Sequence, residues 1–352
     1  MNKDRKLLIY YACSLLIILT LYSGCEETSV TGIFQNPVYE GYDEREAAVN
    51  MTLAALCYTA ENNPNVLEIR DSLILQLSDT AYSTRGQWKL AWGPGVSLSR
   101  GNMMYVAVDS TSDTIYFVIA VRGTDWGFPS NIQEDLEVWN LVRFPYGGAG
   151  DSVAEGSFYG LDTLLAATDP VTGQTLETFL KEIPLGHLKV YITGHSLGGA
   201  LATLVTSWFL NHYYTTKFKL ETYTFASPSV GNAFFVDHYH TFLLAAGAEN
   251  HRVVNTKDLV PYAWAGLNNI IHDNVPTTVP LGVAVSIGLI QSYFNTYGIV
   301  YKHVETRVPI GYLTPSNCSG GTTNENYFCW VAFEHNTNNY LRLLHADTVN
   351  VR

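Results

Sequence analysis

Charged residues are scarce in this sequence of 352 residues, since Asp, Glu, Lys and Arg together make up 15% of it. Lys and Arg number 20 against 32 Asp and Glu, so the formal net charge is −12, and no basic tract occurs. A surface of this sign repels phosphate backbones, so we expect no nucleic-acid partner. Hydrophobic residues make up 47% of the chain, which supplies a large core and excludes an intrinsically disordered protein.

Cysteine is also infrequent, and the five cysteines lack the spacing of a zinc or iron–sulfur site. Cys318 and Cys329 flank a short loop rich in Gly and Asn. There they form either a disulfide, in an oxidising compartment, or two free thiols. Cys57 lies in an apolar helical pattern, so we expect it to be buried as a small hydrophobic residue.

The N-terminus has the pattern of an export signal. A net basic stretch (3–6) precedes a mostly apolar run (7–22), which is shorter than the roughly 20 residues that a membrane span needs. Small residues then lead to Cys25 and resemble a bacterial lipobox, although Tyr22 stands where that motif usually has Leu. We predict a lipoprotein-type signal peptide over residues 1–24, with Cys25 as the lipid anchor. The alternative is a signal anchor.

Helix and strand patterns alternate along the rest of the chain. We expect helices over 44–60, 175–183 and 200–210, and strands over 103–108, 114–121, 188–193, 221–226 and 252–256. The first two strands are separated by a polar turn, which predicts a hairpin. The later alternation predicts an α/β fold, with a mainly parallel central sheet and helices on both faces.

The sequence contains no internal repeat and no Pro- or Ser-rich linker. We therefore predict a tether over residues 25–40 and a single domain over 41–352. An apolar stretch over 267–298 interrupts the core pattern and is too short to span a bilayer. It is either a buried helix or a cap that forms part of an apolar substrate pocket.

One short motif carries chemistry: residues 194–198 read Gly-His-Ser-Leu-Gly and match G-x-S-x-G, the only match in the chain. The motif lies directly between a predicted strand and a predicted helix, as a nucleophile elbow requires. Its glycines leave room for a sharp turn that exposes the hydroxyl of Ser196. The helix that starts there directs backbone N–H groups at the reacting centre, so Ser196 is the candidate nucleophile.

A serine hydroxyl needs a neighbouring base and a third group that orients the base. With a nucleophile elbow the chain order is Ser, then acid, then His. Asp258 follows the strand over 252–256, where α/β sheets keep their sites, and is the candidate acid. His195 is excluded as the base because it neighbours Ser196 on the elbow. The remaining candidate bases are His272, His303, His335 and His345.

The oxyanion of an acyl-transfer intermediate needs two hydrogen-bond donors. The backbone N–H of Leu197, directly after Ser196, supplies one. The strand over 114–121 ends in Arg-Gly-Thr, where Gly123 allows a close backbone approach. Thr124 is the candidate for the second donor, through its N–H and its hydroxyl.

Four segments carry a family resemblance: Val-Arg-Gly-Thr (121–124), Gly-His-Ser-Leu-Gly-Gly-Ala (194–200), Thr-Phe-Ala-Ser-Pro-Ser-Val-Gly-Asn (224–232) and Val-Asn-Thr-Lys-Asp-Leu-Val-Pro (254–261). In this order they resemble the class 3 lipases, the fungal-type triacylglycerol lipases and their bacterial relatives. The resemblance implies an α/β-hydrolase fold.

The resemblance also assigns roles to single residues. It places Thr124 in the oxyanion hole and Asp258 in the catalytic triad. The catalytic His of the family lies near the C-terminus before a Tyr-Leu pair, which selects His335. His303 instead resembles a structural histidine of the family.

A lid usually follows the oxyanion loop in this family. Trp126, Phe128 and Ile132 fall there and are interleaved with acidic residues, which favours an amphipathic lid that opens onto lipid. The alternative is an ordinary surface helix. With the apolar stretch over 267–298, a lid of this kind forms a groove for an acyl chain.

Together these features predict an exported serine hydrolase that needs no cofactor and cleaves carboxylic esters of acylglycerols or related lipids at an interface. We expect it at the periplasmic or cell-surface membrane through Cys25, or secreted if the lipobox is not used. The alternatives within the class are a phospholipase A1 and a short-chain or aryl esterase. The alternative outside it is a lipid-binding module without activity.

Overall fold

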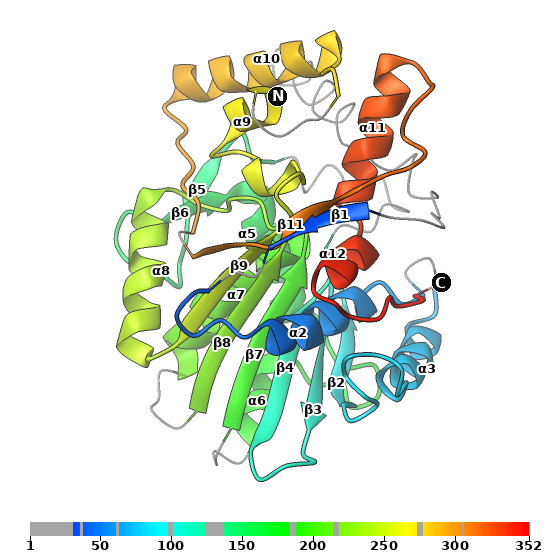
Figure 1. Cartoon of the computed structure of the whole chain (residues 1–352). Coiled ribbons are helices and arrows are strands. Elements are labelled where there is room, and N and C mark those ends of the chain that lie inside the picture. The colour runs from blue at the N-terminus through cyan, green and yellow to red at the C-terminus, as the bar shows by residue number, and fades with distance from the viewer. Residues whose placement is uncertain are drawn as a thin grey trace.

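A mixed seven-stranded sheet lies at the centre of the structure that is described (Figure 1). Its strands are β2 (Lys89–Val96), β3 (Met103–Asp109), β4 (Ile115–Val121), β7 (Leu188–His195), β8 (Phe218–Phe225), β9 (Glu249–Val254) and β10 (Arg307–Pro309), in the spatial order β10-β9-β8-β7-β4-β3-β2. The pairs from β4 to β10 are parallel, and the other two are antiparallel. The predicted, mainly parallel sheet is thus confirmed.

The computed structural model describes residues 31–35, 38–60, 63–97, 101–123, 137–183, 188–213, 218–272, 277–304 and 306–351. The predicted signal peptide and Cys25 lie outside these residues. The oxyanion-hole candidate Thr124 and the lid candidates Trp126, Phe128 and Ile132 also lie outside them.

Helices cover both faces of the sheet (Figure 1). One face carries α2 (Glu44–Leu56), α3 (Val66–Leu77) and α12 (Thr337–Leu343); the other carries α5 (Glu155–Ala166), α6 (Leu176–Glu182), α7 (Leu197–Tyr213) and α8 (Ala233–Ala246). Alternate side chains of β4 serve the two cores, since Val118 and Ala120 pack toward α2 whereas Ile119 and Val121 pack toward α7. This arrangement buries the central strands on both faces, which explains their continuous apolar runs.

The sequence patterns located most of these elements. The predicted hairpin is the antiparallel pair β3–β4, and the predicted helix over 44–60 ends earlier, at Leu56. The sequence analysis did not predict strand β2. Gly93, Pro94 and Gly95 lie inside this strand, where its pairing with β3 shifts register. Such an irregularity interrupts the alternation of apolar and polar residues from which a strand is predicted.

A third apolar core lies above the carboxyl ends of the strands. It is formed by α9 (Leu267–His272), α10 (Leu281–Tyr297) and α11 (Thr323–Glu334), together with the short turn η1 (Val260–Tyr262). Helix α10 buries Val283 and Ile287 in this core, whereas Leu281 is 81% exposed and Val285 and Leu289 are also exposed. The described helices of the stretch over 267–298, α9 and α10, are called the cap below, and α10 is buried on only one side.

Helix α11 is fixed at its start and in its middle. At its N-terminus Thr322 and Glu325 form a reciprocal capping box. A disulfide joins Cys318 to Cys329, which decides between the two alternatives left by the sequence. These restraints matter because His335 is the C-cap residue of this helix.

The segment predicted as a tether contains a short strand. Strand β1 (Thr31–Phe34) pairs antiparallel with β11 (Gly311–Thr314), and a second small ribbon joins β5 (Leu141–Arg143) to β6 (Ser152–Ala154). The pairing holds the start of the described chain beside the β11 segment that leads to α11 (Figure 1). Among the described residues, none of the helices has the length and apolar character that crossing a membrane requires.

Candidate active site

Ser196 lies at the tip of the turn between β7 and α7, with a backbone φ of 61°. This left-handed conformation is unusual for a residue with a side chain and is strained. Close packing enforces it: a Cβ at Gly194 would lie 2.1 Å from the carbonyl oxygen of Gly198. The predicted strand–turn–helix elbow is therefore present, and only glycine fits at the position two before Ser196.

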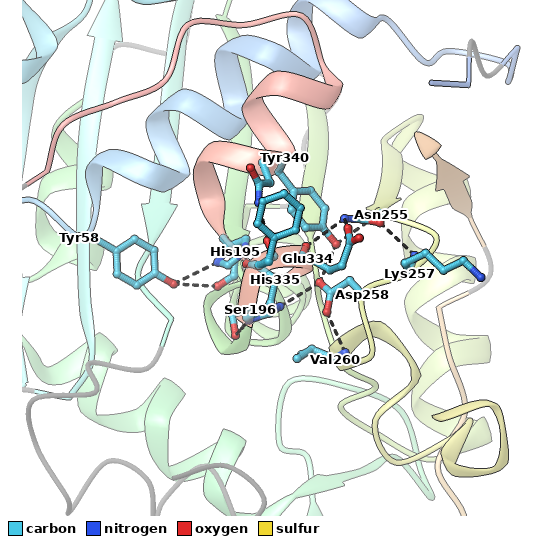
Figure 2. A network of polar contacts seen from close by, with 12 residues as sticks. Tyr58, His195, Ser196, Asn255, Lys257, Asp258, Val260, Glu334, His335 and Tyr340 are labelled. Atoms are coloured by element: carbon cyan, nitrogen blue, oxygen red, sulfur yellow. Dashed lines mark hydrogen bonds and ion pairs between the residues drawn. The ribbon is translucent and has the colours of Figure 1, made fainter. Parts of the chain in front are cut away.

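His335 lies between Ser196 and Asp258 (Figure 2). Its Nε2 is 2.8 Å from the Oγ of Ser196, and its Nδ1 is 2.9 Å from Oδ2 of Asp258. The side chain of His335 is 12% exposed and that of Asp258 is fully buried. Three residues that are far apart in the sequence thus form one line of hydrogen bonds, in the geometry by which a base activates a serine hydroxyl.

The carboxylate of Asp258 is held by further donors. The hydroxyl of Tyr340 donates to Oδ2 at 2.8 Å, and the backbone N–H of Val260 donates to Oδ1 at 3.0 Å. Burial, followed by the charge of Asp258, raises the pKa of Tyr340 well above its usual range, so this hydroxyl remains a donor. These contacts fix the orientation of the buried side chain of Asp258.

The other histidines lie elsewhere. Burial and the neighbouring arginines lower the pKa of His303 to about 3, and no described contact links its ring to Ser196. His345 is an exposed residue after α12 that stacks on Phe34, and His272 ends α9. Of the four candidates, only His335 is within hydrogen-bond distance of both Ser196 and Asp258.

His195, which the sequence analysis excluded as the base, contacts the backbone of His335. Its Nε2 lies 3.0 Å from the backbone oxygen of His335, and its Nδ1 lies 3.3 Å from the hydroxyl of Tyr58. Burial lowers the pKa of His195 well below its usual range, so the ring is neutral. The ring therefore joins the elbow to the backbone of His335.

The surroundings of the hydroxyl of Ser196 suit an oxyanion. Helix α7 begins at Leu197, and the first N–H groups of a helix have no partner within it. Gly123 approaches the elbow so closely that a Cβ there would lie 3.2 Å from that of Ser196. Thr124, the second predicted donor, directly follows Gly123 but lies outside the described residues.

The segment that begins at residue 137, after the predicted lid residues, packs against the cap. Trp139 is buried and contacts Tyr293 and Phe294 of α10, with ring centroids 5.3 Å and 6.1 Å apart. Leu259 and Val331 belong to the same core and are close in sequence to Asp258 and His335. The cap is therefore joined directly to the segments that carry Asp258 and His335.

No metal centre accompanies the site in the described ranges. Within them, His, Cys, Asp and Glu side chains nowhere form a group of three that fits a metal ion.

Comparison with known proteins agrees with this architecture. The family model described as Lipase (class 3) matches residues 118–266, which run from β4 through the elbow and Asp258 to the turn after η1. Over these residues the chain matches the class 3 lipase family. This match includes Ser196 and Asp258 and ends well before His335.

Several lipases are similar to this chain in sequence. Lipase ZK262.3 of Caenorhabditis elegans is 26% identical over 66% of this chain and 59% of its own length. The lipase of Rhizomucor miehei is 29% identical over 49% of this chain and 46% of its own. Secreted mono- and diacylglycerol lipase 1 of Fusarium solani is 37% identical over 48% of this chain and 45% of its own. The matches thus span about half of these relatives.

The crystal structure of M37 lipase has a similar fold, with a TM-score of 0.68 over 87% of this chain and 94% of that one. The sequences are 24% identical, so this likeness concerns the fold alone. It supports the α/β-hydrolase fold that the sequence predicts for this chain.

Gly198→Ala tests the packing behind the elbow. A Cβ at Gly198 would lie 2.4 Å from the carbonyl oxygen of Val121, so the end of β4 must move. We expect a lower free energy of unfolding and at least about a tenfold loss of ester turnover, because a small misplacement of reacting groups is costly. Denaturant titration and steady-state kinetics measure the two effects.

Gly288→Ala in α10 is the matched control. Apart from its chain neighbours and the adjacent backbone of α10 itself, no described atom lies within 4 Å of a Cβ at that position. Since Ala is the better helix former, we expect unchanged turnover and a gain of up to about 1 kcal/mol. Wild-type stability and turnover in Gly198→Ala would contradict the packing described for the elbow.

Proposed function

We propose that this protein is a member of the class 3 lipase family, namely an exported serine hydrolase that cleaves carboxylic ester bonds of acylglycerols or related lipids. The observation that carries the proposal is the line of hydrogen bonds from the Oγ of Ser196 through His335 to Asp258. The strained elbow and the complete burial of Asp258 support it. The names of its relatives, which include a mono- and diacylglycerol lipase, support the substrate class.

In the proposed reaction the Oγ of Ser196 attacks the ester carbonyl while Nε2 of His335 takes the hydroxyl proton. Collapse of the tetrahedral intermediate breaks the bond to the alcohol, which leaves with that proton, and an acyl-serine remains. Water then attacks the acyl-serine by the same route in reverse, so that the fatty acid leaves and Ser196 regains its proton. Asp258 stabilises the imidazolium that forms in each half of the reaction.

The proposed oxyanion hole consists of Leu197 and Thr124. The backbone N–H of Leu197 opens α7, so the partial positive charge of the helix N-terminus adds to this hydrogen bond. Thr124 follows Gly123, whose lack of a side chain allows the loop to approach Ser196. Each such donor typically contributes about 3 kcal/mol of transition-state stabilisation.

The proposed lipid-binding elements are the predicted lid, with Trp126, Phe128 and Ile132, and the cap helix α10. Residues 277–301 contain no Asp, Glu, Lys or Arg, in a chain whose net charge is −12. The outward face of α10 exposes apolar side chains in the same stretch. A neutral surface of this kind approaches lipid without the cost of removing water from charges.

The catalytic assignment predicts the effect of single substitutions. Ser196→Ala and His335→Ala should each lower kcat on a dissolved ester by at least about 10⁴-fold, and the double variant should be little worse, because these groups act as a unit. Steady-state kinetics measures the losses. A dead His303→Ala variant beside an active His335→Ala variant would show that the base is assigned wrongly.

The lid and cap predict a dependence on the acyl chain. Since each buried methylene contributes about 0.8 kcal/mol, kcat/KM should rise from acetate to medium or long acyl chains. Trp126→Ser should reduce hydrolysis of aggregated lipid more than hydrolysis of a dissolved short ester. Only the aggregated lipid offers an apolar surface that an exposed lid can contact. Assays on matched ester series measure both.

Leu244→Ser is the control for the lid variant, because Leu244 is an exposed apolar residue near the end of α8 that leads to the start of β9. Leu244→Ser should leave the hydrolysis of both substrates unchanged. A preference for acetate esters, or an equal loss on both substrates in Trp126→Ser, would favour a plain esterase.

The proposed membrane anchor is Cys25. Cys25→Ser should abolish incorporation of labelled fatty acid when the protein is expressed in a bacterial host, whereas Cys13→Ser should retain it. Mass spectrometry of the mature protein checks the same point. A mature N-terminus other than Cys25 would rule out the anchor.

A further inference from the structure

A second carboxyl group lies buried beside the proposed triad. Glu334 ends α11, directly before His335, and its side chain is fully buried. Its Oε2 accepts a hydrogen bond from Nδ2 of Asn255 at 2.5 Å, and the same Nδ2 donates to the backbone oxygen of Glu334 at 3.0 Å. The reaction proposed above gives this carboxyl no role, and burial without a charged partner is expensive for an acid.

Asn255 connects Glu334 to the acid of the triad (Figure 2). The backbone N–H of Asn255 donates to the hydroxyl of Tyr340 at 3.1 Å, and that hydroxyl donates to Asp258 at 2.8 Å. The backbone N–H of Asp258 in turn donates to the backbone oxygen of Asn255 at 3.2 Å. The side chains of all four residues are fully buried.

These contacts close a ring around the His–Asp pair. Asp258 follows β9 and His335 follows α11, so only non-covalent contacts set the distance between them. The pair Asn255–Glu334, here called the clamp, joins the same two segments on the side away from Ser196 (Figure 2). A shift of either segment would therefore break the clamp together with the hydrogen bond from His335 to Asp258.

The electrostatics of the clamp are consistent with a neutral carboxyl. Burial raises the pKa of Glu334 to about 8; the hydrogen bond from Asn255 opposes this shift, and the charge of Asp258 adds to it. Burial therefore favours the neutral form of the Glu334 carboxyl beside Asp258. Two ionised carboxylates at this depth would repel one another.

We propose that Asn255 and Glu334 are positioning residues, which hold the carboxylate of Asp258 and the imidazole of His335 at hydrogen-bonding distance. The catalytic part of this inference rests on the proposed function, whereas the geometric part concerns the His–Asp pair itself. Neither residue touches the ester. Their effect is expected in kcat, because misplacement of reacting groups by about 1 Å can cost about 100-fold in rate.

The kinetic test uses Glu334→Ala and Asn255→Ala on a dissolved short ester. Each should lower kcat by about 10- to 100-fold with little change in KM, and the double variant should be no worse than the weaker single variant, since both break one clamp. Glu334→Gln retains an acceptor oxygen of the same reach and should restore most of kcat.

A matched control separates positioning from general loss of stability. Glu221 of β8 is also buried and is paired with Lys189 and Lys219, away from the triad. Glu221→Ala should lower the midpoint of thermal unfolding and leave the kcat of the folded protein unchanged. If Glu334→Ala fails to fold, Asn255→Ala carries the same test.

Proton NMR gives a readout that needs no turnover. The Nδ1 proton of His335, bound to Asp258, should give a downfield resonance that is absent in His335→Ala and present in Ser196→Ala. We expect it to shift upfield or broaden in Glu334→Ala and Asn255→Ala, and to persist in Glu334→Gln and Glu221→Ala. If these changes in the resonance occur but the wild-type protein hydrolyses no ester, the proposed function is refuted, whereas the positioning role of Asn255 and Glu334 is retained.

An unchanged resonance in Glu334→Ala and Asn255→Ala, together with wild-type kcat, would overturn the inference.

Discussion

The hydrogen bond between Nδ1 of His335 and Oδ2 of Asp258 is the contact on which the site depends. It joins the segment after β9 to the end of α11, which no covalent bond brings together. Because Asp258 is fully buried, its charge is poorly screened and acts strongly on the neighbouring imidazole. Only an imidazole held in this orientation presents Nε2 to Ser196.

Much of the surrounding structure keeps these two segments in place. The capping box and the disulfide fix α11, whose last turn leads into His335. Tyr340 of α12 donates to Asp258, and the ring of His195 lies against the backbone oxygen of His335. The cap contributes from above, since Leu259 and Val331 pack in its core. The site is therefore assembled from the ends of several elements rather than from one loop.

The elbow imposes a second constraint, which is steric. Ser196 remains in a left-handed conformation because β7 and α7 are packed too closely for any other path, with glycine at 194 and 198. A buried helix and central parallel strands supply the contacts that offset this strain. The backbone strain at Ser196 and the packing that offsets it thus arise from the same short segment of sequence.

Local patterns in the sequence were sufficient for the parts of the fold that obey a regular period. They gave the β3–β4 hairpin, the strand and helix around Ser196, and the position of Asp258 after β9. They did not give β2, whose glycines and proline interrupt the alternation, or the pairing of β1 with β11, which depends on a contact between distant segments.

The site divides in the same way. The spacing within residues 194–198 marks Ser196, but nothing local distinguishes His335 from three other histidines; the family resemblance selected it. Glu334 and Asn255 look like ordinary polar residues in the sequence, because only the packing of α11 against the end of β9 buries them. The positions of these residues in the site therefore depend on long-range packing, which the periodicity of the sequence does not reveal.

Covalent labelling tests the central claim most directly, namely that Ser196 is a nucleophile activated by His335. The folded protein is treated with an alkyl phosphonate ester, and the adduct is located by mass spectrometry of its peptides. We expect one adduct, on Ser196, that is absent in Ser196→Ala and forms far more slowly in His335→Ala. A folded protein that acquires no adduct, or one that is modified at a different residue, would contradict it.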